Sequence, residues 1–279
     1  MPKGPAKPAT PAVPRLRRGY FESPYGQLHV HNAIPAGGGF DEGTSLLCLH
    51  ATPRSGASML PLLALMGLDR SVYAPDLPGY GHSDAPPERP AIADYANAIV
   101  QFCTTMRFRH LDLLGYQTGA LVAAEVAIAL PNLVRRVVLV AVPAPDETER
   151  EAFRRAPWPV PPSADGSHLL VEWNRTRGAV NEGTSLAGIA AAFADKLANG
   201  PRAWWGMQAA LQYPSAERLR LITQPTLLIR SRERGLDPAR ARELLPKARS
   251  LEQAQIHGSD LFESAAPQLS IVLREFLRG

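Results

Sequence analysis

Short apolar runs recur along the chain and alternate with segments of helical periodicity. The pattern becomes strand-like from Tyr20, and residues 27–31 alternate polar and apolar positions, as a half-buried strand does. Continuous apolar runs, typical of strands buried on both faces, follow at 45–50, 71–74, 111–114, 137–142 and 226–229. Helical patterns cover 56–66, 92–106, 118–130, 238–245 and 261–277. This alternation predicts an α/β fold, a doubly wound and mostly parallel sheet with helices on both faces.

The alternation stops between residues 143 and 214. This segment shows no strand-like run, and proline and glycine interrupt its short helical stretches. We interpret it as a helical cap inserted over the strand ends, with the α/β core formed by residues 19–142 and 215–279. The cap holds all four tryptophans of the chain, which form its own core or line an apolar pocket. They are Trp158, Trp173, Trp204 and Trp205.

Residues 1–18 differ in composition from the rest. They contain five prolines, five basic residues and no acidic residue, which predicts a disordered basic tail. Of the 30 Lys and Arg residues, 25 therefore remain in the body, against 26 acidic ones. A near-neutral body argues against nucleic-acid binding.

Composition restricts the class of protein to which the chain can belong. Of the 279 residues, 45% are hydrophobic and 20% are charged, as in ordinary globular proteins. Two cysteines exclude a disulfide framework and a multi-cysteine metal site. No apolar run approaches the ~20 residues of a membrane-spanning helix, and we expect a cytoplasmic protein without membrane contact.

Four segments carry recognisable motifs. They are HATPRSG at 50–56, APDLPGYGHSD at 74–84, LGYQTG at 114–119 and LFESAAP at 261–267. In this order and at these spacings they resemble the α/β-hydrolase fold superfamily across most of residues 20–278. LGYQTG stands where that superfamily has G-x-S-x-G between a strand and a helix. The resemblance implies a hydrolase.

The superfamily's chemistry uses a nucleophile, a histidine base and a carboxylate that orients the histidine. Here the nucleophile position holds Gln117, whose amide is not a usable nucleophile. The position of the acid falls at Arg234, flanked by Glu233 and Asp237. The position of the histidine falls on Ser259 or, with a two-residue shift, on His257.

Two readings of this altered triad remain open. In the first, Gln117 holds a water or a substrate carbonyl, and His257 acts as a base near neutral pH. In the second, Gln117 has drifted in an inactive site and His257 is a surface histidine. In either reading the resemblance implies an oxyanion hole formed by the backbone N–H groups of Thr52 and Thr118, which side-chain changes do not destroy.

The remaining candidates lie next to these motifs. Arg54 could receive an anionic group of the substrate or be solvated. His50 resembles a histidine that supports the turn, although we also count it among the candidate substrate-binding residues, with Trp158, Trp173 and Trp204. Ser55 and the Thr118 hydroxyl are weaker candidates for a relocated nucleophile.

We therefore expect an enzyme that acts on a small, largely apolar carbonyl compound, which can be aromatic. The chemistry is non-covalent hydrolysis, or a lyase, isomerase or cofactor-free oxygenase reaction. The alternative is an inactive pseudo-hydrolase that binds a ligand or serves as a scaffold. No phosphate-binding loop and no metal-ligand spacing are found in the sequence, so no cofactor is expected. The expected partner is a small-molecule substrate, and the pattern specifies no oligomeric state.

Overall fold

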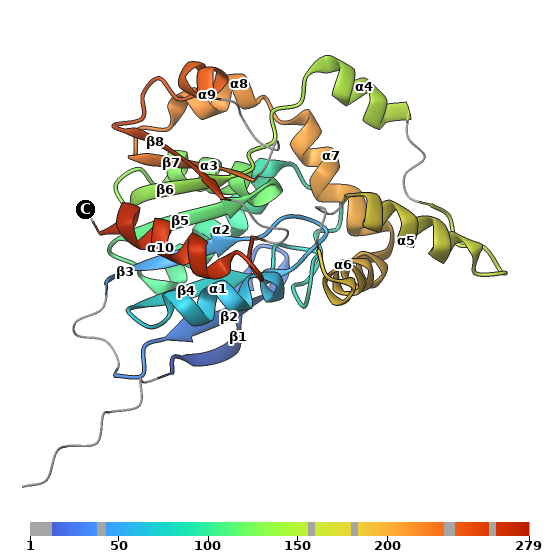
Figure 1. Cartoon of the computed structure of the whole chain (residues 1–279), viewed down its shortest axis with the longest axis horizontal. Helices are drawn as coiled ribbons and strands as arrows, with labels where there is room; N and C mark the ends of the chain where they lie inside the picture. Colours follow the sequence, from blue (N-terminus) through green and yellow to red (C-terminus); the bar gives the residue numbers. More distant parts are fainter. Residues whose placement is uncertain are drawn as a thin grey trace, which may run out of the picture.

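A computed structural model of the chain describes residues 13–37, 43–155, 160–179, 184–231, 238–256 and 261–278. Its centre is an eight-stranded sheet in the order β1-β2-β4-β3-β5-β6-β7-β8 (Figure 1). Strand β2 pairs antiparallel with β1 and β4, and the other neighbours are parallel. The predicted mostly parallel, doubly wound α/β sheet is confirmed. The strands are β1 (Arg15–Ser23), β2 (Gly26–Ile34), β3 (Gly43–Leu49), β4 (Arg70–Pro75), β5 (Leu111–Tyr116), β6 (Val134–Val140), β7 (Thr226–Ser231) and β8 (Leu251–Ile256).

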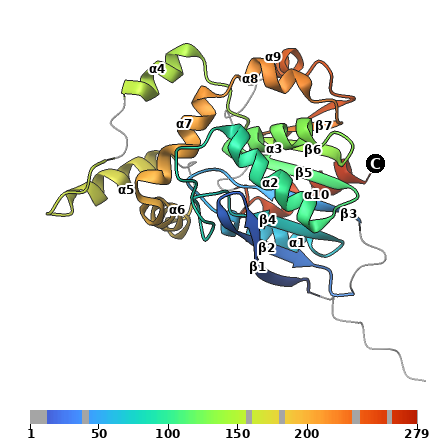
Figure 2. The same cartoon turned by 180° about the vertical axis from the view of Figure 1, so that it is seen from behind.

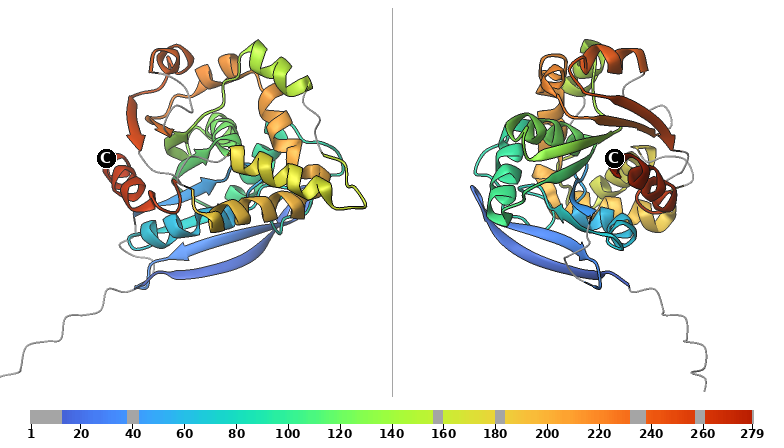
Figure 3. Two further views of the ribbon diagram at one scale, coloured as in Figure 1. Left: turned by 45° about the vertical axis from the view of Figure 1, so that its right-hand side comes forward. Right: turned by 90° about the vertical axis from the view of Figure 1, so that its left-hand side faces the viewer.

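Helices cover both faces of the sheet (Figures 2 and 3). On one face, the short turn η1 (Gly56–Met59), helix α1 (Leu60–Met66) and helix α10 (Ala266–Leu277) pack on side chains such as Leu46 and Cys48 of β3. On the other face, α2 (Ile92–Met106) and α3 (Thr118–Ala129) pack on Leu47 and Leu49. Alternate residues of β3 thus face two separate cores, which explains its continuous apolar run.

Between β6 and β7, the described residues form helices without a strand. These are α4 (Glu147–Arg155), α5 (Ser167–Ala179), α6 (Leu186–Asn199), η2 (Gly200–Trp204), α7 (Trp205–Gln212), α8 (Ser215–Arg218) and η3 (Leu219–Leu221). Figure 1 shows α5, α6 and α7 grouped beside the sheet. Helix α9 (Pro238–Leu244) lies between β7 and β8. Among the described helices, none combines the length and the apolar character that crossing a bilayer requires.

Two predicted boundaries are wrong. The tail was expected to end at residue 18, but β1 begins at Arg15 and pairs it with Ile34 of β2. Its first four side chains are exposed, so the strand is held by backbone pairing that a hydrophobic pattern does not reveal. The last helix begins at Ala266 rather than at residue 261, with Pro267 in its first turn, where proline is favoured.

Candidate active site

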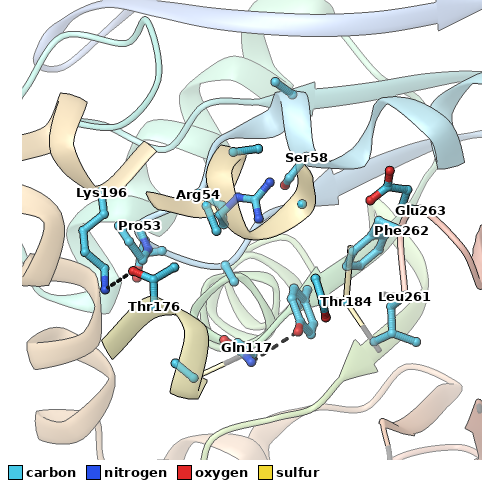
Figure 4. Close-up of a pocket in the computed structure, with 18 of the residues that line it drawn as sticks. Pro53, Arg54, Ser58, Gln117, Thr176, Thr184, Lys196, Leu261, Phe262 and Glu263 are labelled. Atoms are coloured by element: carbon cyan, nitrogen blue, oxygen red, sulfur yellow. Dashed lines mark hydrogen bonds between the residues drawn. The ribbon is translucent and has the colours of Figure 1, made fainter. Parts of the chain in front are cut away.

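A cavity of about 610 Å³ lies between the sheet and the inserted helices. Its walls come from the loop after β3, the end of β5, helices α5, α6 and α7, and the segment before α10. Figure 4 shows Gln117 on one side, Lys196 and Thr176 on another, and Glu263 across from them. The residues that line it include Thr52, Arg54, Ser58, Tyr116, Gln117, Arg175, Thr176, Lys196, Trp204, Phe262 and Glu263.

Gln117 occupies a sharp turn between β5 and α3. Its backbone has φ 49° and ψ −116°, a region that residues other than glycine rarely adopt. The turn is held because the Gln117 N–H donates to the Val140 carbonyl at 3.0 Å and the Gln117 carbonyl accepts from the Ala120 N–H at 2.8 Å. A Cβ on Gly119 would overlap the Leu49 carbonyl oxygen, so the helix packs closely on β3 at this point. The surrounding backbone therefore imposes the strained conformation.

The Gln117 side chain is half-buried and faces the cavity. Its Nε2 donates to the Tyr116 hydroxyl at 3.3 Å, and the Tyr116 ring packs edge-on against Phe262 with centroids 5.0 Å apart. An amide offers two N–H donors and a carbonyl acceptor, so capacity remains for a bound molecule. Gln117 can bind and orient a polar group, but it cannot attack one.

Thr52 and Thr118 lie side by side beneath the cavity. Both are buried, and their hydroxyl oxygens are 3.0 Å apart. Thr118 is the first residue of α3, where the backbone N–H has no acceptor within the helix and the helix dipole is positive. Thr52 lines the cavity itself. This placement is compatible with the predicted pair of backbone donors, whose use on a substrate remains a prediction.

His50 does not line the cavity, and its expected contact with a substrate stays a prediction. The ring is fully buried. Its Nδ1–H donates to the Ala51 carbonyl at 2.9 Å, and its Nε2 accepts from the Leu77 N–H at 2.8 Å. Burial lowers the pKa of His50, which keeps the ring neutral as this pattern requires. His50 therefore ties the turn after β3 to the loop after β4.

Arg54 lines the cavity, but its guanidinium already has a partner. Its Nε donates to Oδ2 of Asp195 in α6 at 2.7 Å. Burial raises the pKa of Asp195, and Arg54 opposes this rise. The pair connects the loop after β3 to the inserted helices at the edge of the cavity.

The tryptophans have different positions. Trp204 is buried and lines the cavity. Trp173 is not among the lining residues and packs edge-on against Phe193 with centroids 5.5 Å apart, and its expected substrate contact stays a prediction. Trp158 lies outside the described residues. One tryptophan thus serves the cavity and another the packing of α5 on α6.

Sequence reasoning missed a polar group on the cavity wall. The Lys196 ammonium donates to the Thr176 hydroxyl at 3.0 Å, lies 3.3 Å from Oε2 of Glu172 and sits over the Trp204 ring at 4.9 Å. Arg175 donates to the other Glu172 oxygen at 3.0 Å. Burial lowers the pKa of Lys196, and the charge of Glu172 opposes this. The signal in the sequence was weak, because these residues come from two helices about 20 positions apart.

The remaining predicted catalytic residues, His257, Glu233 and Asp237, lie outside the described residues, as does Ser259. Their roles stay predictions. Of the weaker hydroxyl candidates, Ser55 is buried and outside the cavity lining. Ser58 lines the cavity, and its hydroxyl donates to the Ser55 carbonyl at 2.7 Å.

Comparisons with known proteins agree with this architecture. A family model described as "Alpha/beta hydrolase family" matches residues 46–267. The structure of Cfl2 from Burkholderia cenocepacia superposes with a TM-score of 0.76 at 22% identity, covering 94% of this chain and 96% of that one. An enol-lactonase from Burkholderia xenovorans LB400 gives a TM-score of 0.75 at 16% identity, covering 94% of this chain and all of that one (100%). At these identities the likeness concerns the fold.

Curated relatives match only in part. A Mycobacterium bovis protein described as uncharacterized is 28% identical over 118 residues, which is 42% of this chain and 35% of that one. The pimeloyl-[acyl-carrier protein] methyl ester esterase of Photobacterium profundum is 32% identical over 100 residues, which is 36% of this chain and 37% of that one. The chain thus spans little more than a third of the length of these two relatives.

Proposed function

The chain belongs to the alpha/beta hydrolase family, and we propose that it acts on a small, largely apolar carbonyl compound without forming a covalent acyl-enzyme. The observation that carries this proposal is the position of Gln117. It stands in the strained turn at the cavity, where the family's chemistry places a nucleophile, yet it is an amide. Strain of this kind costs about 1–3 kcal/mol and is concentrated at functional sites.

In the proposed reaction, the substrate carbonyl lies at the start of α3. The backbone N–H groups of Thr118 and Thr52 donate to its oxygen and stabilise the negative charge that develops there. Donors of this kind are worth about 3–4 kcal/mol each in related chemistry. The Gln117 amide orients the carbonyl or a water molecule, and the apolar wall near Trp204 and Phe262 holds the rest of the substrate.

The proton transfer is assigned to His257. A histidine titrates near neutral pH and can take a proton from water or from a carbon next to the carbonyl. Glu233 or Asp237 orients its ring in this proposal. The reaction is then non-covalent hydrolysis, or a lyase, isomerase or cofactor-free oxygenation step. Proteins similar to this chain include an enol-lactonase and a methyl ester esterase, which supports esters and lactones as the first substrates to test.

Two experiments test the proposal: a screen of candidate substrates, and labelling with a probe that reacts with nucleophilic serines. The full chain is incubated with separate esters, lactones and aromatic ketones, and products are followed by mass spectrometry. We expect turnover that falls at least 100-fold in Gln117→Ala and in His257→Ala. His110→Ala is the matched control, because His110 is exposed and lies outside the cavity lining. A fluorophosphonate should leave the wild-type protein unlabelled, and labelling of Ser58 would instead indicate a relocated nucleophile.

The second candidate function is ligand binding without turnover. It is favoured by the same amide, because Gln117 binds polar groups without attacking them. The two candidates separate cleanly in this screen. A compound that binds with a measurable Kd, weakened in Gln117→Ala, and stays chemically unchanged would support binding alone.

A further inference from the structure

A second cluster of reactive side chains lies away from the cavity. His29 and His31 stand two residues apart on β2, so their side chains project from the same face of the sheet. Asp76 follows β4, and its N–H donates to the His29 carbonyl at 2.8 Å. Exposed fractions are 1% for His29, 6% for His31 and 0% for Asp76. Within the described residues, none of the three lines the cavity of the candidate active site.

The three side chains converge. One potential ligand atom from each of His29, His31 and Asp76 lies within 4.8 Å of the others. His29 Nδ1 and Asp76 Oδ2 are 2.8 Å apart. The ring centroid of His29 is 4.6 Å from that of His31 and 5.1 Å from that of His82. Two imidazoles that bind one ion through nitrogens about 2.0–2.1 Å away place their ring centres roughly 4.5–5.2 Å apart, so both pairs have suitable spacing.

From this geometry we infer a binding site for a transition-metal dication of the zinc type, held by His29, His31 and Asp76, with the exposed His82 ring turning toward these three converging ligands to supply the fourth. Imidazole and carboxylate ligands suit Zn²⁺ and its neighbours Co²⁺ and Ni²⁺. The ion takes the place of the proton between His29 Nδ1 and Asp76 Oδ2. A neutral ring keeps its single N–H by moving it from Nδ1 to Nε2, whereas a doubly protonated ring releases one proton to solvent. The His31 ring stands nearly perpendicular to the His29 ring, with an angle of 89° between their planes.

The surroundings of Asp76 support this site. Its Oδ1 accepts from the Gly56 N–H at 2.7 Å, and its Oδ2 also accepts from the His82 N–H at 2.9 Å. These bonds fix the carboxylate, as the outer contacts of metal ligands usually do. A Cβ on Gly81 would overlap Asp76 Oδ2, so glycine leaves the space that the carboxylate needs.

A cation can reach this site from solvent, and one nearby positive charge, that of Arg18, opposes its binding. His82 is exposed, so an ion can enter from solvent beside its ring. Arg18 stands opposite His31 in the β1–β2 ladder and is also exposed, so solvent and salt screen its repulsion of a cation. An ion here would join β2 to the loop after β4. Sequence inspection missed it because the ligands are separated by about 45 positions and meet only through the pairing of β2 with β4.

Metal binding by the full chain, prepared without a polyhistidine tag, tests the inference. Co²⁺ serves as a spectroscopic probe and Zn²⁺ as the ion for affinity and melting measurements. We expect one Co²⁺ per chain, with the visible d–d bands of a four-coordinate site that Zn²⁺ abolishes. Zn²⁺ at 100 times its Kd should raise the Tm by about 5 °C.

Variants identify the ligands. His31→Ala and His82→Ala should weaken Zn²⁺ binding at least 10-fold and remove the d–d bands, whereas His110→Ala should bind as the wild type does. Because His82 is exposed, its variant keeps the test valid if His31→Ala does not fold. Absence of d–d bands in the wild type would show that the rings only pack edge to face, and equal affinity in His82→Ala and wild type would exclude His82 as the fourth ligand. Activity is not the readout, so this test is independent of the proposed function.

Discussion

The hydroxyl oxygens of Thr52 and Thr118 lie 3.0 Å apart and join two segments that are 66 positions apart in the chain. One segment is the turn after β3, and the other is the start of α3. These segments carry the two backbone N–H groups that we propose as carbonyl donors. The hydroxyl contact therefore sets the spacing of the proposed oxyanion hole through side chains that do not react.

Valine substitutions measure this coupling. Thr118→Val leaves the buried Thr52 hydroxyl without this partner and should lower the free energy of unfolding by about 1–2 kcal/mol. The double variant Thr52→Val/Thr118→Val should cost less than the sum of the two single changes, because it removes both polar groups together. Urea unfolding of the four proteins gives the coupling energy. Strict additivity would show that the two hydroxyls do not depend on each other.

Substitutions at Gln117 should separate stability from function. Gln117→Gly relieves the strain of φ 49°, and after the entropic cost of glycine we expect a gain of about 1 kcal/mol in the free energy of unfolding. Gln117→Ala keeps the strain and removes the amide, so its stability should match the wild type. Both variants should lose carbonyl binding, as measured by titration calorimetry. A Gln117→Gly protein less stable than Gln117→Ala would mean that the turn is not strained.

The central strands and the turn at Gln117 were predictable because their signals are local. Parallel strands buried on both faces are continuous apolar runs, and the segment 114–119 has a recognisable sequence between a strand and a helix. The start of β1 was not predictable in this way. Arg15 is exposed, and its place in the sheet depends on backbone pairing with Ile34.

Side-chain clusters were the hardest features to predict. Lys196 and Glu172 meet because α5 packs against α6, and His29 and Asp76 meet because β2 pairs with β4. In both cases the contact depends on tertiary packing, and neither spacing forms a motif. For His50 the motif was recognised from the sequence, but the contacts of its ring were not. Only the three-dimensional contacts show that both ring nitrogens serve the loops.

An ion pair between Glu125 of α3 and Arg218 of α8 should make stability depend on pH. Glu125 accepts from Arg218 through both carboxylate oxygens and from the Tyr213 hydroxyl, each at 2.7 Å. Burial alone raises the pKa of Glu125, but these hydrogen bonds and the charge of Arg218 together lower it below its ordinary value of 4.5. The contribution is therefore fully present above pH 4.5 and disappears as pH falls through the lower pKa of the folded state.

Glu125→Gln tests this dependence. At pH 7 it should lower the free energy of unfolding by about 2 kcal/mol, a moderate value because Arg218 is partly exposed to solvent. The difference from wild type should shrink below pH 4.5. Denaturant unfolding at pH 7 and at several acidic values measures it, with Glu217→Gln as the control because Glu217 is exposed on the neighbouring helix α8. A difference that is constant with pH would exclude titration of Glu125 as the cause.

Two truncations test whether the start of β1 contributes to stability although it lies in a segment of proline-rich, basic composition. Removing residues 1–12 should leave the Tm unchanged, since their proline-rich composition cannot bury enough apolar surface to contribute. Removing residues 1–18 also deletes Pro14, which is buried near Gly67, and the four β1 residues that pair with 31–34. Lost backbone hydrogen bonds at roughly 1 kcal/mol each should then lower the Tm by several degrees, measured by calorimetry. Equal melting temperatures for the two truncated proteins would mean that the start of β1 adds nothing to stability. Residues 1–18 would then behave as a tail, as their composition predicts.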